Sequence, residues 1–287
     1  MTKAIRAELL KLRKRSMTWI LLYVLIGIMI IVHLLLYLVS KISLPGPGGA
    51  RVGNLETLLG LPMSIPFALA MLSSFGAVLT VILIASSTGN EYNWRTIRVA
   101  LISSEGRFRF LGAKLISIGT YVVIGMVVGV ATGFIMGLIT TAIGGNAFDF
   151  SFATGTYLWD QFLQFWRTFF IILPFAMLGF LFALIGRSAM PGIAIGIGIL
   201  FLEPIITSLM LLAGGWVAKI PNYLFNANVN AINALNNLPI PQGGFAGGVA
   251  NGSQTPSVIH AFVVLSVYIV VCAVTAFYLF RKRDITG

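Results

Sequence analysis

Six long apolar runs, separated by shorter polar segments, dominate the hydropathy pattern of the chain. In a helix that rises about 1.5 Å per residue, each run is long enough to cross the ~30 Å hydrocarbon layer of a bilayer. The runs cover residues 17–39, 67–88, 111–140, 162–186, 190–213 and 258–280. The pattern therefore predicts an all-α membrane protein, in which residues 17–287 form one domain of six transmembrane helices.

The polar breaks between the runs predict how the helices connect. The break "GRSAMPG" at 186–192 contains Arg187 and Pro191, and it is short enough for a tight hairpin between two helices. The longest segment that does not span is 214–257, which we expect outside the cytoplasm. Its Asn-rich part, 223–237, is too polar to span and predicts short helices at the outer interface of the membrane, tolerated where protein covers them.

Composition and charge support the same architecture. The chain is 58% hydrophobic and 9% charged, whereas soluble domains are roughly 25% charged. With six spans, 15 of the 19 Lys and Arg fall on one side of the membrane. The positive-inside rule makes that side cytoplasmic, with both termini inside. Topology thus explains the net charge of +11, and we expect no nucleic-acid partner.

The N-terminal segment 1–16 is predicted to be an amphipathic helix on the inner leaflet. Ile5, Leu9 and Leu12 recur at helical spacing, and basic residues surround them. The alternative is a plain basic tail that binds anionic lipid.

Glycine recurs every four residues in the third apolar run. These positions are Gly125, Gly129, Gly133 and Gly137. Four-residue spacing places them on one helix face, where another backbone can approach closely. We expect a packing seam, either within the chain or between two chains; the alternative is the ordinary glycine enrichment of membrane helices.

Glu203 lies well inside the fifth apolar run and is followed by Pro204. A charged group at mid-bilayer costs about 2.5–3.5 kcal/mol on insertion scales. Two explanations stay open: part of a substrate path or proton relay, or a carboxyl group that bonds a neighbouring helix.

Familiar catalytic and cofactor motifs are absent from the sequence. It has no G-x-x-x-x-G-K-[ST] phosphate loop, no H-E-x-x-H and no G-x-S-x-G. Its one cysteine, Cys272, lies in an apolar run and excludes an intrachain disulfide. We expect a non-enzymatic chain that binds no cofactor or metal of its own.

The stretch "GNEYNWRTIRVALISSEGRFRFLGAK" at 89–114 concentrates polar residues between the second and third runs. If residues 90–102 are helical, Glu91, Arg95 and Arg98 share one face, with Glu91 and Arg95 in the favourable order for an ion pair. Such a helix is a charged rod at the membrane surface. The alternative is simple topology anchoring, which needs the arginines but not the acid.

This stretch resembles the permease subunits of ABC-2 type transporters, in which a Glu-Tyr-x-x-Gly-Thr-x-Arg segment follows the second span, and an Arg and a Lys come before the third. The counterparts here are Glu91, Tyr92, Thr96, Arg98, Arg107 and Lys114. Arg95 stands where that family usually has glycine, and Ser103, Ser104 and Glu105 replace a common proline. The six-span plan, the N-terminal helix and the tail at 280–285 agree with the resemblance, which covers essentially the whole chain.

The resemblance implies a division of labour. This chain would form the substrate path in a prokaryotic plasma membrane, as a pair of identical or related permease chains. A separate ATPase subunit would bind ATP-Mg and dock on the cytoplasmic loop 89–110, through Glu91, Tyr92, Arg95, Thr96, Arg98 and Arg107. The alternatives are a secondary carrier that uses Glu203 and a non-transporting membrane scaffold or immunity protein. The sequence does not indicate a substrate.

Overall fold

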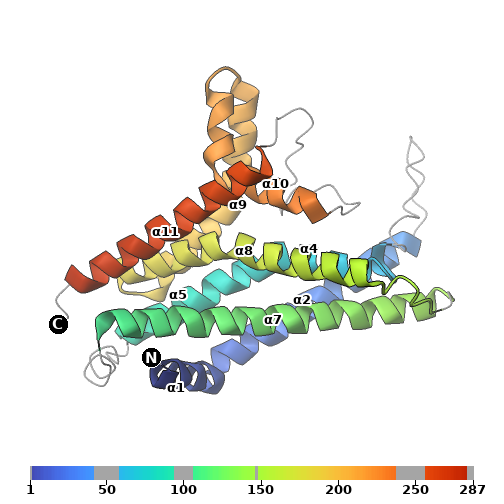
Figure 1. Ribbon diagram of the computed structural model, residues 1–287, viewed down its shortest axis with the longest axis horizontal. Coiled ribbons are helices and arrows are strands. Elements are labelled where there is room, and N and C mark those ends of the chain that lie inside the picture. The colour runs from blue at the N-terminus through green and yellow to red at the C-terminus, as the bar shows by residue number, and fades with distance from the viewer. Residues whose placement is uncertain (1, 42–57, 94–105, 146–147, 237–255, 283–287) are drawn as a thin grey trace.

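The computed structural model describes residues 2–41, 58–93, 106–145, 148–236 and 256–282, and over these residues it is helical with no β-strand (Figure 1). Within these described ranges, six helical segments are long and apolar enough to cross a membrane. Each coincides with one of the six predicted runs, so the all-α class and the number of spans are confirmed. The chain therefore has the features of a multi-pass membrane protein.

The first half of the fold contributes three spans. Helix α1 (Thr2–Lys14) is followed by α2 (Ser16–Lys41), the first span. The second span is continuous but irregular, because a π-helical turn, η1 (Leu72–Gly76), joins α4 (Ser64–Met71) to α5 (Ala77–Asn93). The third span, α7 (Arg107–Ile143), has 37 residues. It begins four residues before the predicted run, since polar residues extend the helix beyond its apolar part.

The second half contributes the other three spans: α8 (Gly155–Gly186), α9 (Ala189–Ala213) and α11 (Val258–Lys282). Between α9 and α11 lie the short helices η2 (Val217–Tyr223), α10 (Phe225–Asn233) and η3 (Ala234–Asn236). These confirm the prediction of short helices in the Asn-rich segment. Most of the predicted non-spanning segment beyond Asn236, residues 237–255, lies outside the described residues.

The predicted hairpin between the fourth and fifth spans is also confirmed. Helix α8 ends at Gly186, and Arg187 follows with a left-handed φ of 52°. The Ser188 side chain then caps α9 by accepting a hydrogen bond from the Met190 amide at 3.5 Å. Two caps on adjacent residues reverse the chain without a loop.

Helix α8 is the centre of the bundle. In its most apolar stretch 67% of residues are buried, against 17% in α2 and in α11. Its neighbours are α5, α9 and α11, whereas α7 packs on α1, α2 and α4. The ends marked N and C lie toward the same end of the bundle, together with the end of α5 and the start of α7 (Figure 1).

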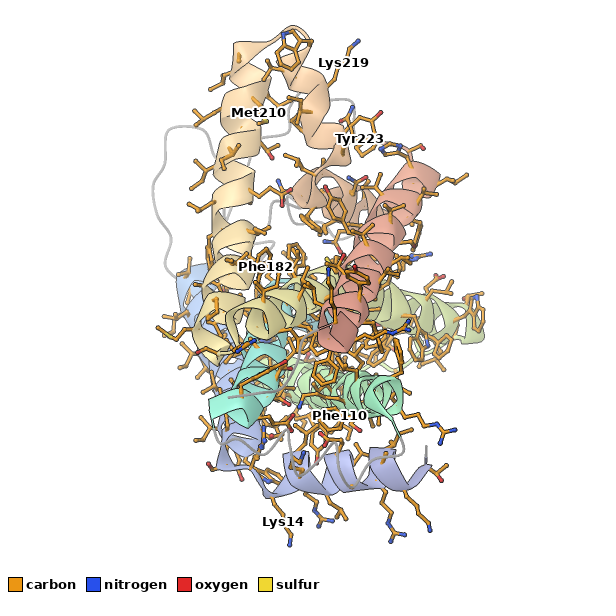
Figure 2. The ribbon with its side chains drawn as sticks, turned by 90° about the vertical axis from the view of Figure 1, so that its left-hand side faces the viewer. Lys14, Phe110, Phe182, Met210, Lys219 and Tyr223 are labelled. Carbon is orange, nitrogen blue, oxygen red and sulfur yellow. The ribbon has the colours of Figure 1, made fainter. Side chains whose placement is uncertain are left out.

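Helix α9 diverges from the bundle in its second half. Figure 2 shows Met210 far above Phe182, with η2 returning beside α9 through Lys219 and Tyr223. The diverging half exposes a row of large apolar side chains: Leu202, Ile205, Ile206, Leu209 and Leu212.

Candidate functional site

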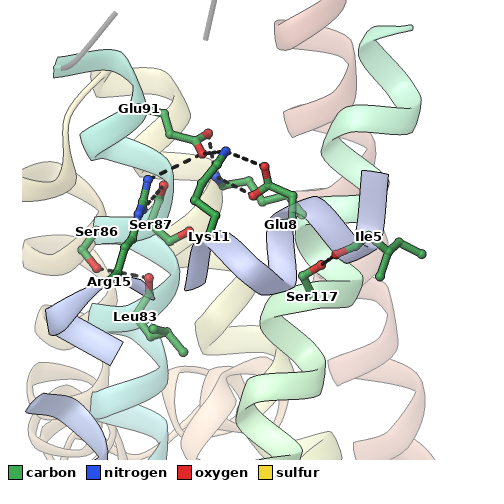
Figure 3. A network of polar contacts seen from close by, with 10 residues as sticks. Ile5, Glu8, Lys11, Arg15, Leu83, Ser86, Ser87, Glu91 and Ser117 are labelled. Carbon is green, nitrogen blue, oxygen red and sulfur yellow. Dashed lines mark hydrogen bonds and ion pairs between the residues drawn. The ribbon is translucent and has the colours of Figure 1, made fainter. Parts of the chain in front are cut away.

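Five charged side chains gather where α1 crosses the ends of α5 and α7 (Figure 3). Helix α1 and the residue after it supply three, Glu8, Lys11 and Arg15; α5 supplies Glu91 and α7 supplies Lys114. We call these five residues the charged cluster. It joins segments that are about 80 and 100 residues apart in the sequence.

Glu91 is the hub of the charged cluster. Its Oε2 lies 2.6 Å from Lys114 Nζ, and its Oε1 accepts a hydrogen bond from Lys11 Nζ at 2.8 Å. Arg15 approaches Oε1 to 3.7 Å. At 2.6 Å, the contact of Glu91 with Lys114 is the shorter of its ion pairs with the two lysines.

Glu8 links the other end of the charged cluster. Lys11 Nζ donates to Glu8 Oε1 at 2.5 Å, and Lys114 Nζ lies 3.9 Å from Glu8 Oε2. Both acids therefore share both lysines. A buried charge is tolerated when partners of opposite sign surround it, and this alternation permits Glu91 and Lys114 to be only 2% exposed.

The two neighbouring carboxylates change the pKa of Lys11. Burial acts to lower the pKa, but the Glu91 charge and the hydrogen bonds to Glu8 and Glu91 outweigh it and raise the pKa above its usual value of 10.5. Lys11 is thus held in its charged form throughout the neutral range.

Two hydroxyl groups of α7 also hold α1 in place. Ser117 Oγ donates to the Ile5 carbonyl at 3.2 Å, and the Tyr121 hydroxyl donates to the Leu9 carbonyl at 3.3 Å. The buried side chains of α1 are Glu8 and Leu12. The prediction of a helix in this segment is confirmed. The amphipathic pattern did not predict, however, that Glu8 lies on the buried face of this helix, toward α7.

Phe110 connects the charged cluster to the last helix. Its ring lies 5.8 Å from Lys114 Nζ and 5.9 Å from Lys11 Nζ, within the range of a cation–π contact. It also stacks on Phe280 of α11 at 6.4 Å between centroids. All contacts of the cluster thus meet at the end of the bundle where the chain termini lie.

The predicted coupling residues are only partly described. Glu91 and Tyr92 end α5, whereas Arg95, Thr96 and Arg98 lie outside the described residues. Arg107 begins α7, but its side chain is also outside the description. Glu91 itself is buried under Lys11 and beside Lys114. The predicted helix over 90–102 lies outside the described residues beyond Asn93, so the charged rod stays a prediction.

Three of the four predicted glycines form a seam within the chain. A Cβ atom would lie 2.8 Å from Leu72 at Gly129, 2.3 Å from Ala68 at Gly133 and 2.3 Å from Ser64 at Gly137. Their partners Ser64, Ala68 and Leu72 recur at the same four-residue spacing, so α4 and η1 lie directly against α7. Gly125 differs, since its Cβ position has no neighbour within 4 Å.

Glu203 caps a short helix. Its Oε1 accepts a hydrogen bond from the Asn226 amide at 2.6 Å, at the N-terminus of α10. The helix dipole and the unpaired amides at that position favour a negative group. The buried carboxyl group thus bonds a neighbouring helix, which is the second of the two explanations considered for Glu203.

Sequence reasoning missed Glu8, Lys11 and Arg15 as site residues, because their charges had been assigned to topology and lipid. The available signal was that Glu8 is the one acid among the first 54 residues, which otherwise carry eight Lys and Arg. Within the described residues, no group of three His, Cys, Asp or Glu is arranged to hold a metal ion.

The chain belongs to the DUF2705 family, whose description is a protein of unknown function and whose model matches residues 54–286. It is also similar to the uncharacterized protein YhcI of Bacillus subtilis strain 168, with 22% identity over 218 residues. That match covers 72% of this chain and 64% of YhcI, so the chain spans less than two thirds of this curated relative. The matched family region contains Glu91 and Lys114 but not α1.

Proposed function

We propose that this chain is the permease subunit of an ATP-driven exporter of the ABC-2 type, in a prokaryotic plasma membrane with both termini in the cytoplasm. The chain forms the substrate path and is not itself an enzyme. A separate ATPase subunit binds ATP-Mg and docks on the loop that begins after α5. A second permease copy, or a related chain, completes the transporter.

One observation carries the proposal: Glu91, the last charged residue of α5 before the loop, is ion-paired to the start of α7 and to α1. A partner that moves the loop would move Glu91. Because both lysines are bound to the same carboxylate, the movement would reach α7 and α1 together. This arrangement fits a loop that transmits force into the membrane rather than one that only fixes topology.

The apolar row on the second half of α9 supports a second permease copy. Leu209 and Leu212 are 61% and 84% exposed, and the neighbouring η2 leaves this face uncovered. A second copy that packs on α9 would cover this row of apolar side chains, which the described part of one chain leaves exposed.

The contact of Glu203 weighs against the secondary-carrier alternative. A proton-relay group needs access to a path on both sides, whereas Glu203 Oε1 is bound to a backbone amide at 2.6 Å. The carboxyl group therefore has a structural role available that requires no titration.

The test is affinity purification of the full chain from its native host in mild detergent, with mass spectrometry of the proteins that co-elute. We expect a stoichiometric partner with a G-x-x-x-x-G-K-[ST] loop. The double variant Arg95→Gln/Arg98→Gln should lose this partner. The matched control Arg281→Gln/Lys282→Gln, which removes two charges at the end of α11, should keep it.

A purification without any nucleotide-binding partner, repeated with chemical crosslinking, would contradict the proposal. That result would favour a secondary carrier that uses Glu203, or a non-transporting membrane scaffold or immunity protein.

A further inference from the structure

Two adjoining cavities lie beside the charged cluster, and they differ in chemistry. The first, of about 250 Å³, is enclosed mainly by apolar side chains of α2, α5 and α7, including Leu22, Leu79 and Met126. The second, of about 390 Å³, is the more polar of the two: polar and basic residues (Lys14, Arg15, Ser16, Ser86, Ser87 and Asn90) line it beside apolar ones. Thr18 and Leu83 line both cavities, so the two meet at these side chains.

Three consecutive cations lie along the junction. Arg13 lines the apolar cavity, and Lys14 and Arg15 line the polar one. The backbone at this position is fixed, since the Trp19 indole donates to the Arg13 carbonyl at 2.8 Å and Arg15 Nη1 donates to the Ser87 carbonyl at 3.3 Å. Figure 3 shows Arg15 beside Ser86, Ser87 and Leu83 of α5.

The apolar cavity opens toward the outside of the bundle between α2 and α7. Trp19 of α2 and Ile124 of α7 both line it, and they are 46% and 45% exposed. A ligand could therefore enter sideways from the hydrocarbon layer. An apolar cavity that continues into a polar, basic one matches an amphiphile with a long apolar tail and an anionic head group.

We propose that these cavities bind one anionic phospholipid from the leaflet in which α1 lies. Part of one acyl chain occupies the apolar cavity between α2, α5 and α7 and the rest of the tails lies in the bilayer, while the phosphate lies in the polar cavity against Lys14 and Arg15, with Arg13 at the junction. Lysine and arginine are the side chains that pair with phosphate oxygens. The bound lipid stabilises the junction between α1 and α2. This inference does not depend on the proposed transport function.

The test is native mass spectrometry of the full chain in mild detergent, titrated with phosphatidylglycerol or phosphatidylcholine of identical acyl chains. We expect one phosphatidylglycerol to be retained per chain and phosphatidylcholine to bind more weakly. The Arg13→Gln/Lys14→Gln variant should bind phosphatidylglycerol about 30-fold more weakly, because each cation near an anionic lipid contributes about five-fold. The control Lys3→Gln/Arg6→Gln removes two exposed cations of the same helix and should bind as the wild type does.

A second pair of variants tests the tail. Gly125 lines the apolar cavity and has no neighbour within 4 Å of its Cβ position, so the larger side chain of Gly125→Leu takes up space in the cavity. It should abolish retention of both lipids. Gly119 is equally open on the same helix but lines neither cavity, so Gly119→Leu should retain phosphatidylglycerol.

Four results would overturn the proposal. The first three are equal retention of the two lipids by the wild type, wild-type retention by Gly125→Leu, and equal loss of lipid in both glycine variants. Excess inorganic phosphate should not displace the lipid; displacement would show a phosphate site without a lipid tail and would likewise overturn it.

Discussion

The carboxylate of Glu91 and the ammonium of Lys114 lie 2.6 Å apart, at the end of α5 and near the start of α7. Each is only 2% exposed. The chain between these two helices passes through residues 94–105, so the ion pair closes the base of the loop that we propose as the docking point of an ATPase. Lys11 of α1 donates a hydrogen bond to the same carboxylate, so α1 is joined to the pair as well.

Breaking this pair should destabilise the protein strongly. Glu91→Gln leaves Lys114 buried without its nearest counter-charge, and the loss of one partner of a buried pair costs about 3–5 kcal/mol. Lys114→Met in the same chain removes the unpaired charge, so the double variant should recover most of that loss.

The measurement is the free energy of unfolding in detergent micelles. Asp160→Asn, an exposed acid on α8, is the control and should change it by less than about 0.5 kcal/mol. A Glu91→Gln variant as stable as this control would contradict the burial of the pair.

The reactivity of Lys11 should report the same contact. Because its pKa is raised, the contribution of charged Lys11 is fully present below its ordinary pKa and is lost only as pH rises through the higher folded value. At pH 8.5 an amine-acylating reagent should therefore modify Lys11 much more slowly than the exposed Lys3. In Glu91→Gln the pKa of Lys11 should fall and its modification should accelerate, while Lys3 stays unchanged as an internal control. Peptide mass spectrometry measures both rates, and equal rates in the wild type would show that Lys11 is not held by the two acids.

The six spans could be predicted because a lipid environment demands a minimum apolar length, and length and composition are visible in the sequence. The charged cluster could not be predicted. The Glu8–Lys114 contact depends on how α1 packs across α7, which hydropathy and spacing along the chain do not specify. The π-helical turn at Leu72–Gly76 also escaped prediction, because it changes the helical period without changing apolar composition.

The glycine seam gives a matched pair of substitutions. Gly133→Ala would place its Cβ 2.3 Å from Ala68 Cβ, with the Ser64 carbonyl at 3.4 Å, so α4 must shift. Overpacking of this kind costs typically 1–3 kcal/mol. Gly125→Ala meets open space and should be neutral or stabilising by about 0.5–1 kcal/mol, since alanine favours a helix. Thermal unfolding of the two variants side by side measures the difference. Equal melting temperatures would mean that α4 and α7 are not in contact at Gly133.

Glu203 should behave as a cap and not as a proton carrier. Glu203→Gln keeps an oxygen that can accept from the Asn226 amide, so the folding of α10 and transport should be retained. Glu203→Leu removes the acceptor and should weaken the start of α10 by about 0.5–2 kcal/mol. Hydrogen exchange of the amides in Phe225–Asn233 measures the change, with Ser208→Ala on α9 as the control. Loss of transport in Glu203→Gln with unchanged exchange would instead support the carrier alternative.

The most direct test of the account is the ATP hydrolysis rate of the proposed ATPase partner in proteoliposomes with this chain, compared between the wild type and the Glu91→Gln/Lys114→Met variant. This double variant should fold and retain the ATPase, since the charge of Lys114 is removed, Glu8 and Lys11 keep each other as partners, and Arg15 keeps the Ser87 carbonyl. We predict that the wild-type chain and the Asp160→Asn control change the hydrolysis rate of the ATPase to the same extent, whereas the double variant leaves it close to the rate of the ATPase alone. A double variant that changes the rate as the wild type does would contradict the claim that the Glu91–Lys114 pair transmits movement between the loop and the membrane helices.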